Sequence, residues 1–242
     1  MRTAKTVLTV IQERGKQKKP IERVYKLLFN RELYLNAYAK LYPNNGAMTK
    51  GVTDETVDGM SIQKIDRMIE ILREEKYQWK PARREYIKKK NGKKRPLGIP
   101  VWGDKVLQEV MRQILEAYYE PQFSEHSHGF RPNRGCHTAL QEIQVWKGTR
   151  WFIEGDISQY FDTIDHKILL EILARNIHDG RFIRLISNML EAGYLEEWKF
   201  NQTISGVPQG GVISPILANI YLNEFDNWIE EVLIPKYTKG KR

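Results

Sequence analysis

The chain has 242 residues, 41% of them hydrophobic, and a formal net charge of +9. Its one cysteine, Cys136, excludes an internal disulfide, and such a composition is typical of the reducing cytosol. No apolar run approaches the ~20 residues of a membrane span, and the N-terminus lacks the apolar stretch and small-residue cleavage site of a signal peptide. We therefore expect a cytoplasmic protein with no membrane partner, built as one large domain or two small ones.

The positive charge is concentrated in the first 100 residues. These hold 24 of the 39 Lys and Arg residues and 11 of the 30 Asp and Glu residues, a net charge of +13, whereas the rest of the chain has −4. Scattered lysines often serve solubility alone. An excess of this size, interspersed with Tyr and Trp, favours a polyanionic partner, and we take nucleic acid as that partner.

The first predicted elements are helices. Residues 21–42 carry apolar side chains at helical spacing, and residues 58–77 form an amphipathic stripe. Turn-forming residues separate the two, and we expect a helix cap at Thr53 or Asp54.

A hairpin and a longer helix are expected next. Asn91 and Gly92 stand between two short mixed strands and predict a hairpin over residues 79–101. Apolar periodicity predicts a helix over residues 103–123, capped near Asp104 and stopped by Pro121.

The remaining elements alternate short strands with helices. We expect a strand within residues 149–158, helices over 162–177 and 180–194, a strand pair over 198–208, and a last helix opening at Ser214 and Pro215. This order predicts an α+β fold, helix-rich with small antiparallel sheets. Four aromatic residues on apolar segments are expected in the core: Tyr118, Tyr119, Trp146 and Trp151.

One carboxylate stands at the end of a predicted strand. Asp156 follows the apolar residues 151–153, and a buried strand ending in a carboxylate suits Mg²⁺, which takes one or two carboxylates plus substrate phosphates. The alternative is that Asp156 only stabilises a turn. For Asp162 and Asp165 we favour capping of the following helix. A two-metal site also needs a partner carboxylate for Asp156.

Several ordered motifs resemble those of one enzyme family. "RPLGIP" and "HGFRP" are followed by "GDISQYFDTIDH" and by "GVPQGGVISPILANIYLNEFD". Together they resemble consecutive blocks of the reverse transcriptases that bacterial group II introns encode, proteins that also act as maturases. The matching region runs from about residue 75 to 228, and the preceding stretch resembles that family's N-terminal extension.

The resemblance implies a right-hand polymerase with fingers and a partial palm. Residues 1–75 would be the basic helical extension of the fingers, residues 76–150 the fingers, and residues 151–242 part of the palm. Asp156 matches the first catalytic aspartate, which binds the Mg²⁺ pair, with the Ile157 carbonyl as a second ligand.

The resemblance also implies a nucleotide pocket. Phe161 matches the bulky residue beneath the incoming sugar that disfavours a 2′-hydroxyl. Gln209 matches the glutamine beside the incoming nucleotide, and Gly210 lets the backbone approach it. Arg95 and Lys89 match fingers residues that bind the triphosphate, although hairpin spacing varies in this family. A tight turn is an alternative reason for the glycines, and a solvated surface cation is the alternative for Arg95.

Basic residues suggest an RNA-binding surface. The hairpin lysines, namely Lys88, Lys89, Lys90, Lys93 and Lys94, are expected to follow an RNA backbone. Arg131 and Arg134 lie in a predicted turn and are expected to bind phosphate or a neighbouring carboxylate. A zinc site is the weaker interpretation of the neighbouring His126, His128, Cys136 and His137, because their spacing matches no common finger.

Two functions follow from these patterns. The first is an RNA-directed DNA polymerase that uses an RNA template, a DNA primer and dNTPs. The second is a maturase that stabilises folded group II intron RNA without polymerase chemistry. Exposed apolar surface in an incomplete palm would also allow pairing with a second copy.

The family's Tyr-x-Asp-Asp motif is expected after the last helix, but this chain has no Asp-Asp pair. We therefore expect a fragment, and phosphoryl transfer without all of its carboxylates should fail because it depends on positioned charge. Primer extension with the purified 242-residue chain should show no template-dependent dNTP addition. Addition of even one templated nucleotide would contradict this prediction.

Overall fold

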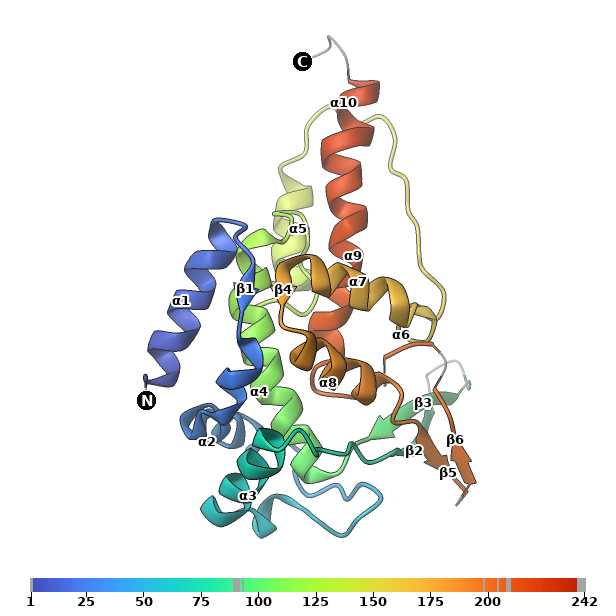
Figure 1. Cartoon of the computed structure of the whole chain (residues 1–242). Coiled ribbons are helices and arrows are strands. Elements are labelled where there is room, and N and C mark those ends of the chain that lie inside the picture. Colours follow the sequence, from blue (N-terminus) through green and yellow to red (C-terminus); the bar gives the residue numbers. More distant parts are fainter. Residues whose placement is uncertain are drawn as a thin grey trace.

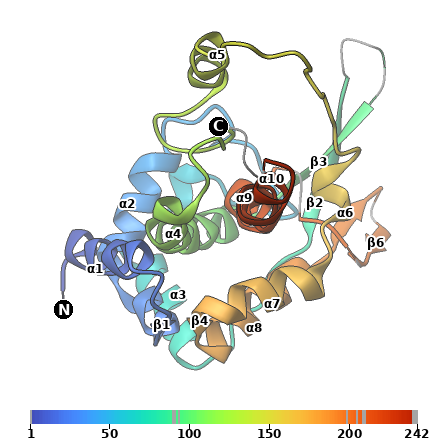
Figure 2. The same cartoon turned by 90° about the horizontal axis from the view of Figure 1, so that it is seen from above.

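The computed structural model describes residues 2–88, 92, 94–197, 199–203, 205–207 and 210–238. Helices form most of this structure, and two small sheets lie beside them (Figures 1 and 2). One hydrophobic core joins residues from Ala4 to Ile220, so the N-terminal helices and the last long helix share the same interior. Within the described residues, no helix has the length and apolarity needed to cross a bilayer.

The first half of the chain contains four α-helices and three strands within its described part. They are α1 (Ala4–Lys16), β1 (Ile21–Glu22), the 3₁₀ segment Val24–Phe29, α2 (Arg31–Leu41), a 3₁₀ turn (Val57–Gly59), α3 (Ile62–Arg73), β2 (Ala82–Lys88), β3 (Lys94–Ile99) and α4 (Trp102–Tyr119). The hairpin predicted over residues 79–101 is confirmed as β2 and β3.

The second half adds shorter helices around one long one. They are a 3₁₀ turn (Glu120–Gln122), α5 (Cys136–Gln144), α6 (Tyr160–Thr163), α7 (His166–Asn176), β4 (Ile177–His178), α8 (Gly180–Leu190), β5 (Tyr194–Glu196), β6 (Lys199–Asn201), α9 (Ser214–Trp228), a π-helical turn (Ile229–Leu233) and α10 (Ile234–Tyr237). The last long helix begins at Ser214, as predicted.

The sheets are mixed, whereas the sequence predicted antiparallel ones. In the larger sheet the strand order is β3-β2-β5-β6; β2–β3 and β5–β6 are antiparallel hairpins, but β2 and β5 pair in parallel. In the smaller sheet β1 and β4 are also parallel. Parallel pairs join segments that are distant along the chain, so local turn signals did not reveal them.

Helix α4 is at the centre of the fold. Figure 2 shows α4 and α9 close together, with α1 and α2 on one side and β2 and β3 on the other. Thirteen of the 18 residues of α4 are buried, and the predicted core positions of Tyr118 and Tyr119 are confirmed. A helix that is buried on nearly all sides must find partners for its polar side chains.

Asp104 is one of these buried polar residues, and its partners come from the chain before β2. The sequence predicted a helix cap near this residue, but α4 begins after Val101 and Asp104 lies in its first turn. Its buried carboxylate accepts hydrogen bonds from the Tyr77 hydroxyl at 2.6 Å and the Lys80 backbone N–H at 3.0 Å. Asp104 therefore holds the segment before β2 against α4.

Other helices begin at different residues from those predicted, because other side chains cap them. The helix predicted over residues 21–42 is interrupted at Asn30, whose side chain accepts from the Glu32 N–H and caps α2. The cap expected at Thr53 or Asp54 is instead provided by Ser61 at the start of α3. Asp165 caps α7 as predicted, whereas Asp162 lies inside the short helix α6.

The strand predicted within residues 149–158 is wrong. Residues 151–157 form an irregular connection that runs down the outside of the molecule to α6 (Figure 1). Trp151 and Ile153 are 86% and 94% exposed, and Trp146 is also exposed, so two of the four predicted core aromatics lie outside the core. Among the described residues no strand pairs with this segment, and an extended segment without a ladder partner gains little stability.

Burial raises the pKa of the Asp104 carboxyl to about 6, an effect that hydrogen bonds from Tyr77 and Lys80 only partly offset. Because this value exceeds the unfolded value of ~3.9, the contribution of Asp104 to stability is fully present below pH ~4 and is lost as pH rises through ~6. The loss is on the order of 3 kcal/mol. Urea unfolding from pH 4 to 7 should show this slope in the parent and not in Asp104→Asn. Asp58→Asn, at an exposed position, is the control and should keep the slope.

Candidate nucleotide-binding site

Three parts of the chain that are distant in sequence meet: strand β3 of the hairpin, helix α6, and the described residues 205–207 and 210–212. Backbone hydrogen bonds join two of them. The Val207 N–H donates to the Phe161 carbonyl and the Gly206 N–H donates to the Ile164 carbonyl, both at 2.8 Å. The motif around Phe161 and the motif around Gly210 are therefore neighbours in space.

Two glycines allow this close approach. Gly206 has φ +89°, and a Cβ there would lie 2.8 Å from the Phe161 carbonyl oxygen. Gly210 has φ +103°, and its Cβ would lie 2.7 Å from the Gly98 carbonyl oxygen on β3. Any L-residue at either position would be strained and would clash. The structure thus shows a packing reason for these glycines, while their approach to a nucleotide stays a prediction.

Alternate residues of β3 lie on the same face of the strand, and one of these faces is directed toward Gly210. Leu97 contacts the position that a Gly210 side chain would occupy, and Arg95 lies two residues earlier on the same face of β3. Arg95 is exposed and pairs in register with Ile87. The structure therefore places the Arg95 side of the hairpin toward the segment that contains Gly210.

The Phe161 ring has an aromatic neighbour that the sequence did not indicate. The Phe130 ring meets it edge to face, with centroids 6.1 Å apart and planes at 85°. The Asn219 side chain on α9 donates to the neighbouring Gly129 carbonyl at 2.8 Å, and this bond ties the Phe130 turn to the last long helix. Phe130 therefore packs against the Phe161 ring from a turn that α9 holds in place.

Helix α4 anchors the loops on either side of this region. The buried Gln108 side chain accepts from the Val212 N–H at 2.9 Å. The Lys105 ammonium donates to the Gly46 and Thr49 carbonyls at 3.2 and 3.0 Å, and burial, then the charge of Arg83, lower its pKa. These bonds hold the loop after α2 over a cavity of about 240 Å³ whose walls include Leu97, Trp102, Gly210 and Val212.

The predicted metal-binding residues lie on the exposed connection before α6. Asp156 and Ile157 are both exposed, and within the described residues no three His, Cys, Asp or Glu side chains gather as metal ligands. One carboxylate and one carbonyl are hard oxygen donors and so fit part of a Mg²⁺ ligand set, to which substrate phosphates would add.

Several predicted residues lie outside the part of the chain that the structure describes. They are Lys89, Lys90 and Lys93 in the hairpin loop, and Gln209 beside Gly210. The neighbouring Lys88 and Lys94 are described: they stand opposite each other in the β2–β3 register and are exposed. The described lysines therefore present positive charge where the two strands enter the hairpin loop.

Arg131 and Arg134 lie elsewhere, in the turn between α4 and α5, and both contact carboxylates. The buried Arg131 guanidinium pairs with Glu120 at 3.0 Å and donates to the Ser124 and Ser127 carbonyls. Arg134 pairs with the exposed Glu125. Of the two partners predicted for these arginines, phosphate or carboxylate, the structure shows the carboxylate.

The histidines beside these arginines also have a carboxylate partner. His128 contacts Glu142 on α5 at 2.8 Å, His126 contacts the same carboxylate, and their hydrogen bonds, with that of His128 the stronger effect, lower the pKa of Glu142. Cys136, the first residue of α5, is exposed.

The sequence of this chain is similar to a known protein family. Residues 87–238 match the family described as "Reverse transcriptase (RNA-dependent DNA polymerase)". This chain belongs to the reverse transcriptase family. The match includes β3, α6 and residues 205–212, which carry the candidate site residues. It also includes α9, which holds the Phe130 turn.

Two relatives of this chain have names that refer to introns. The chain is 51% identical over 209 residues to the group II intron-encoded protein LtrA of Lactococcus lactis, which covers 86% of this chain and 35% of LtrA. It is 47% identical over 237 residues to an uncharacterized 91 kDa protein in the cob intron of Schizosaccharomyces pombe, covering 95% of this chain and 29% of that protein. The chain thus spans about a third of the length of these relatives.

The fold also matches a solved reverse transcriptase assembly. A chain of a partial Cas6-RT-Cas1–Cas2 complex aligns with 86% of this chain and 35% of that chain, with a TM-score of 0.56 and 21% sequence identity. At this identity the match shows the fold alone, and it supports the α+β arrangement of a polymerase fingers and palm.

Sequence reasoning missed the residues that position the candidate site. Phe130 belongs to the "HGFRP" motif, but only tertiary structure places it against Phe161. Lys105 and Gln108 carried no distinguishing signal, because α4 also contains polar residues that are only partly buried, such as Arg112, Gln113 and Glu116. A polar residue on a buried helix needs a specific partner, although the sequence does not say which one.

Proposed function

We propose that this chain is the fingers and part of the palm of a group II intron reverse transcriptase, an RNA-directed DNA polymerase. We assign residues 1–75 to the N-terminal extension, residues 76–150 to the fingers and residues 151–242 to the partial palm. The observation that supports the proposal is the meeting of β3, α6 and the described residues 205–207 and 210–212, joined by the bonds from Val207 and Gly206. These parts of the chain carry Arg95, Phe161 and Gly210, three of the residues to which we give a role in nucleotide binding.

The proposed reaction joins a dNTP to a primer paired with an RNA template. The primer 3′-hydroxyl attacks the α-phosphate, and pyrophosphate leaves. Arg95 and Lys89 would neutralise the triphosphate charge, and such electrostatic stabilisation provides most of the catalysis in phosphoryl transfer. Phe161, which packs against Phe130, would lie beneath the sugar, and Gln209 and Gly210 would complete the pocket.

Asp156 and the Ile157 carbonyl would hold divalent cations, which we propose to be Mg²⁺, together with the substrate phosphates. When bound, Mg²⁺ stabilises the attacking and leaving oxygens of such a displacement. The connection that carries both residues is exposed, so the chain itself leaves this carboxylate accessible to an incoming triphosphate.

We further propose group II intron RNA as a partner, a cytoplasmic bacterial location and pairing with a second copy. The intron-encoded relative from a bacterium supports the first two. The third is supported by exposed apolar side chains on and after α9, among them Phe225, Trp228, Val232 and Ile234.

The polymerase proposal is tested in a chimera that joins this chain to the C-terminal remainder of the Lactococcus relative. Asp156→Asn should lower primer extension by at least about a hundredfold, since removing one fixed group that stabilises transition-state charge has effects of this size. Asp165→Asn is the matched control: Asn also caps helices, so extension should be unchanged. Equal extension by the Asp156→Asn variant and its parent would contradict the role of this carboxylate.

A maturase role without polymerase chemistry is the second candidate. The net charge of +13 over residues 1–100 and the exposed Lys88 and Lys94 favour it. Both candidates require RNA binding by the basic hairpin, which the 242-residue chain alone can test.

Charge reversal at the five hairpin lysines, Lys88, Lys89, Lys90, Lys93 and Lys94, should weaken binding of structured intron RNA. Each lost phosphate contact should also flatten the slope of log K against log salt by about 0.7 to 0.9. Filter binding from 50 to 300 mM KCl measures both effects. Reversal at four exposed lysines of the other half, Lys147, Lys167, Lys199 and Lys236, is the control. An unchanged slope in the hairpin variant would remove the hairpin from the RNA interface.

A further inference from the structure

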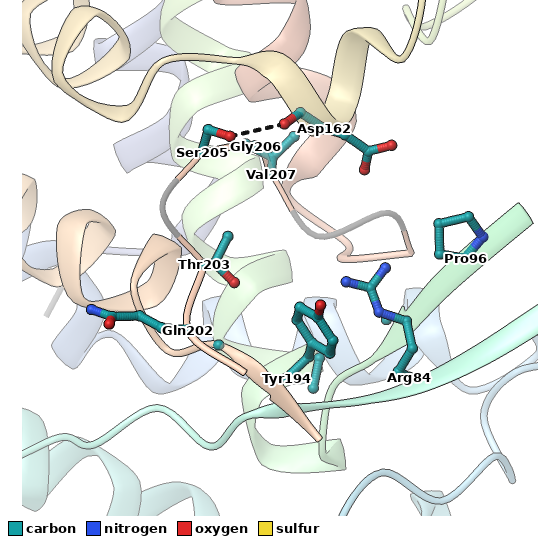
Figure 3. A pocket seen from close by; sticks show the side chains of 12 residues that line it. Arg84, Pro96, Asp162, Tyr194, Gln202, Thr203, Ser205, Gly206 and Val207 are labelled. Atoms are coloured by element: carbon teal, nitrogen blue, oxygen red, sulfur yellow. Dashed lines mark hydrogen bonds between the residues drawn. The ribbon is translucent and has the colours of Figure 1, made fainter. Parts of the chain in front are cut away.

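A cavity of about 330 Å³ lies on the opposite face of β3 from Arg95. Its walls come from β2, β3, β5, α6, residues 202 and 203, and residues 205–207 (Figure 3), and include Arg84, Pro96, Asp162, Tyr194, Gln202 and Thr203. Its volume is at the lower end of the range of small-molecule sites, ~300–1,000 Å³. Among the described nucleotide-binding residues carried over from the family, namely Arg95, Phe161 and Gly210, none lines this cavity, so the roles given to these three residues do not explain it.

Arg84 is the notable group in this cavity. Its guanidinium carbon lies 3.7 Å from the centre of the Tyr194 ring, a cation–π contact that fixes the plane of the guanidinium. Its Nε is buried and has no hydrogen-bond partner among the described residues. A buried donor without a partner costs free energy. Because Arg84 lines the cavity, the rest of its guanidinium can donate to a ligand there.

The opposite wall presents an acceptor. Figure 3 shows the Asp162 carboxylate and the Arg84 guanidinium pointing into the same space from different elements. The Ser205 hydroxyl donates to the Asp162 backbone carbonyl at 3.1 Å and so holds the wall in place. An ionised carboxylate accepts several hydrogen bonds at once, so Asp162 can receive donors from a ligand in addition to its protein contacts.

These two walls select for a neutral ligand with acceptors on one side and N–H donors on the other. A phosphate satisfies Arg84 but brings negative charge toward Asp162, which is unfavourable. A guanine base satisfies both, because its O6 and N7 accept a bidentate pair from arginine and its N2 amino group donates to a carboxylate. Adenine offers arginine a single acceptor, N7, beside a donor.

We propose that this cavity binds a guanine base. Pro96 and the backbone of Gly98 form an apolar wall beside it, while Arg84 and Asp162 read its edges. The base can come from a free guanine nucleotide or from an unpaired guanine in an RNA strand, since both present the same edges. This site goes beyond the proposed polymerase function, because it requires neither Asp156 nor a metal ion.

The first test uses the unmodified 242-residue chain and isothermal titration calorimetry. GMP should bind at least about tenfold more tightly than AMP, than 7-deaza-GMP, which lacks N7, and than IMP, which lacks the N2 amino group. Inorganic phosphate should not compete with GMP. Equal affinities for GMP and AMP, or full competition by phosphate, would show that an anion rather than a base is recognised and would overturn the proposal for free nucleotides.

The RNA source is tested with two single-stranded oligonucleotides, an oligo-U and the same oligo-U with one central guanosine. Tighter binding of the second, by about tenfold, assigns the site to RNA guanines, whereas preference for GMP without preference in RNA assigns it to the free nucleotide. Absence of both preferences overturns the proposal.

Variants then locate the site. Arg84→Lys keeps the charge but loses the bidentate geometry. The affinity for GMP should therefore fall to about the affinity for AMP. Lys199→Gln, at an exposed position on β6 of the same sheet, is the control and should keep the preference. Circular dichroism confirms that both variants fold. A preference for guanine that survives Arg84→Lys would place the base elsewhere and reject this cavity as its site.

Discussion

The fold depends on the polar side chains that α4 carries into the interior. Asp104, Lys105, Gln108 and Glu109 occupy consecutive turns of a helix that is buried on nearly all sides, and each is at most 8% exposed. A buried polar group without a partner costs about 1–3 kcal/mol, so each of the four requires a fixed neighbour. The packing of α4 is therefore compatible with only a few arrangements of the surrounding chain.

Each of these side chains fixes a different segment. Asp104 binds the chain before β2, Lys105 the loop after α2, and Gln108 the backbone at Val212. Glu109 pairs with Arg112 on its own helix and with Lys40 on α2. Two of these contacts reach the candidate nucleotide site: Gln108 holds the backbone at Val212, and Lys105 holds the loop that lines the same cavity as Leu97 and Gly210. The polar contacts of one helix therefore help to set the geometry of this site.

The close contacts at Gly206 and Gly210 have two consequences for the reverse transcriptase. They bring the Phe161 carbonyl and β3 against one loop, which gathers the motifs on the Arg95 face of the hairpin. They also leave a separate cavity on the Arg84 face, lined by Gly206 and Val207 from that same loop. One loop thus contributes to two chemically different surfaces, and a ligand on either surface would contact residues that help to position the other.

Part of the local structure, and the family, could be predicted from the amino-acid sequence alone. Apolar periodicity and turn residues predicted α3, the β2–β3 hairpin, α4, the start of α9 and the Asp165 cap, because these depend on neighbours within a few residues. The ordered motifs likewise indicated a group II intron reverse transcriptase. Local signals did not reveal α1, whose Gly15 packs directly on the Tyr118 carbonyl of α4.

Features that depend on contacts between distant parts of the chain could be seen only in the tertiary structure. It placed Asp104 in the core instead of at a cap, paired β1 with β4 and β2 with β5 in parallel, and set Phe130 against Phe161. It also left residues 151–157 irregular and exposed, although their side chains are typical of a strand. A strand needs a partner in space, and a buried polar group needs a partner of the right chemistry, and neither partner can be identified from the residues next to it in the chain.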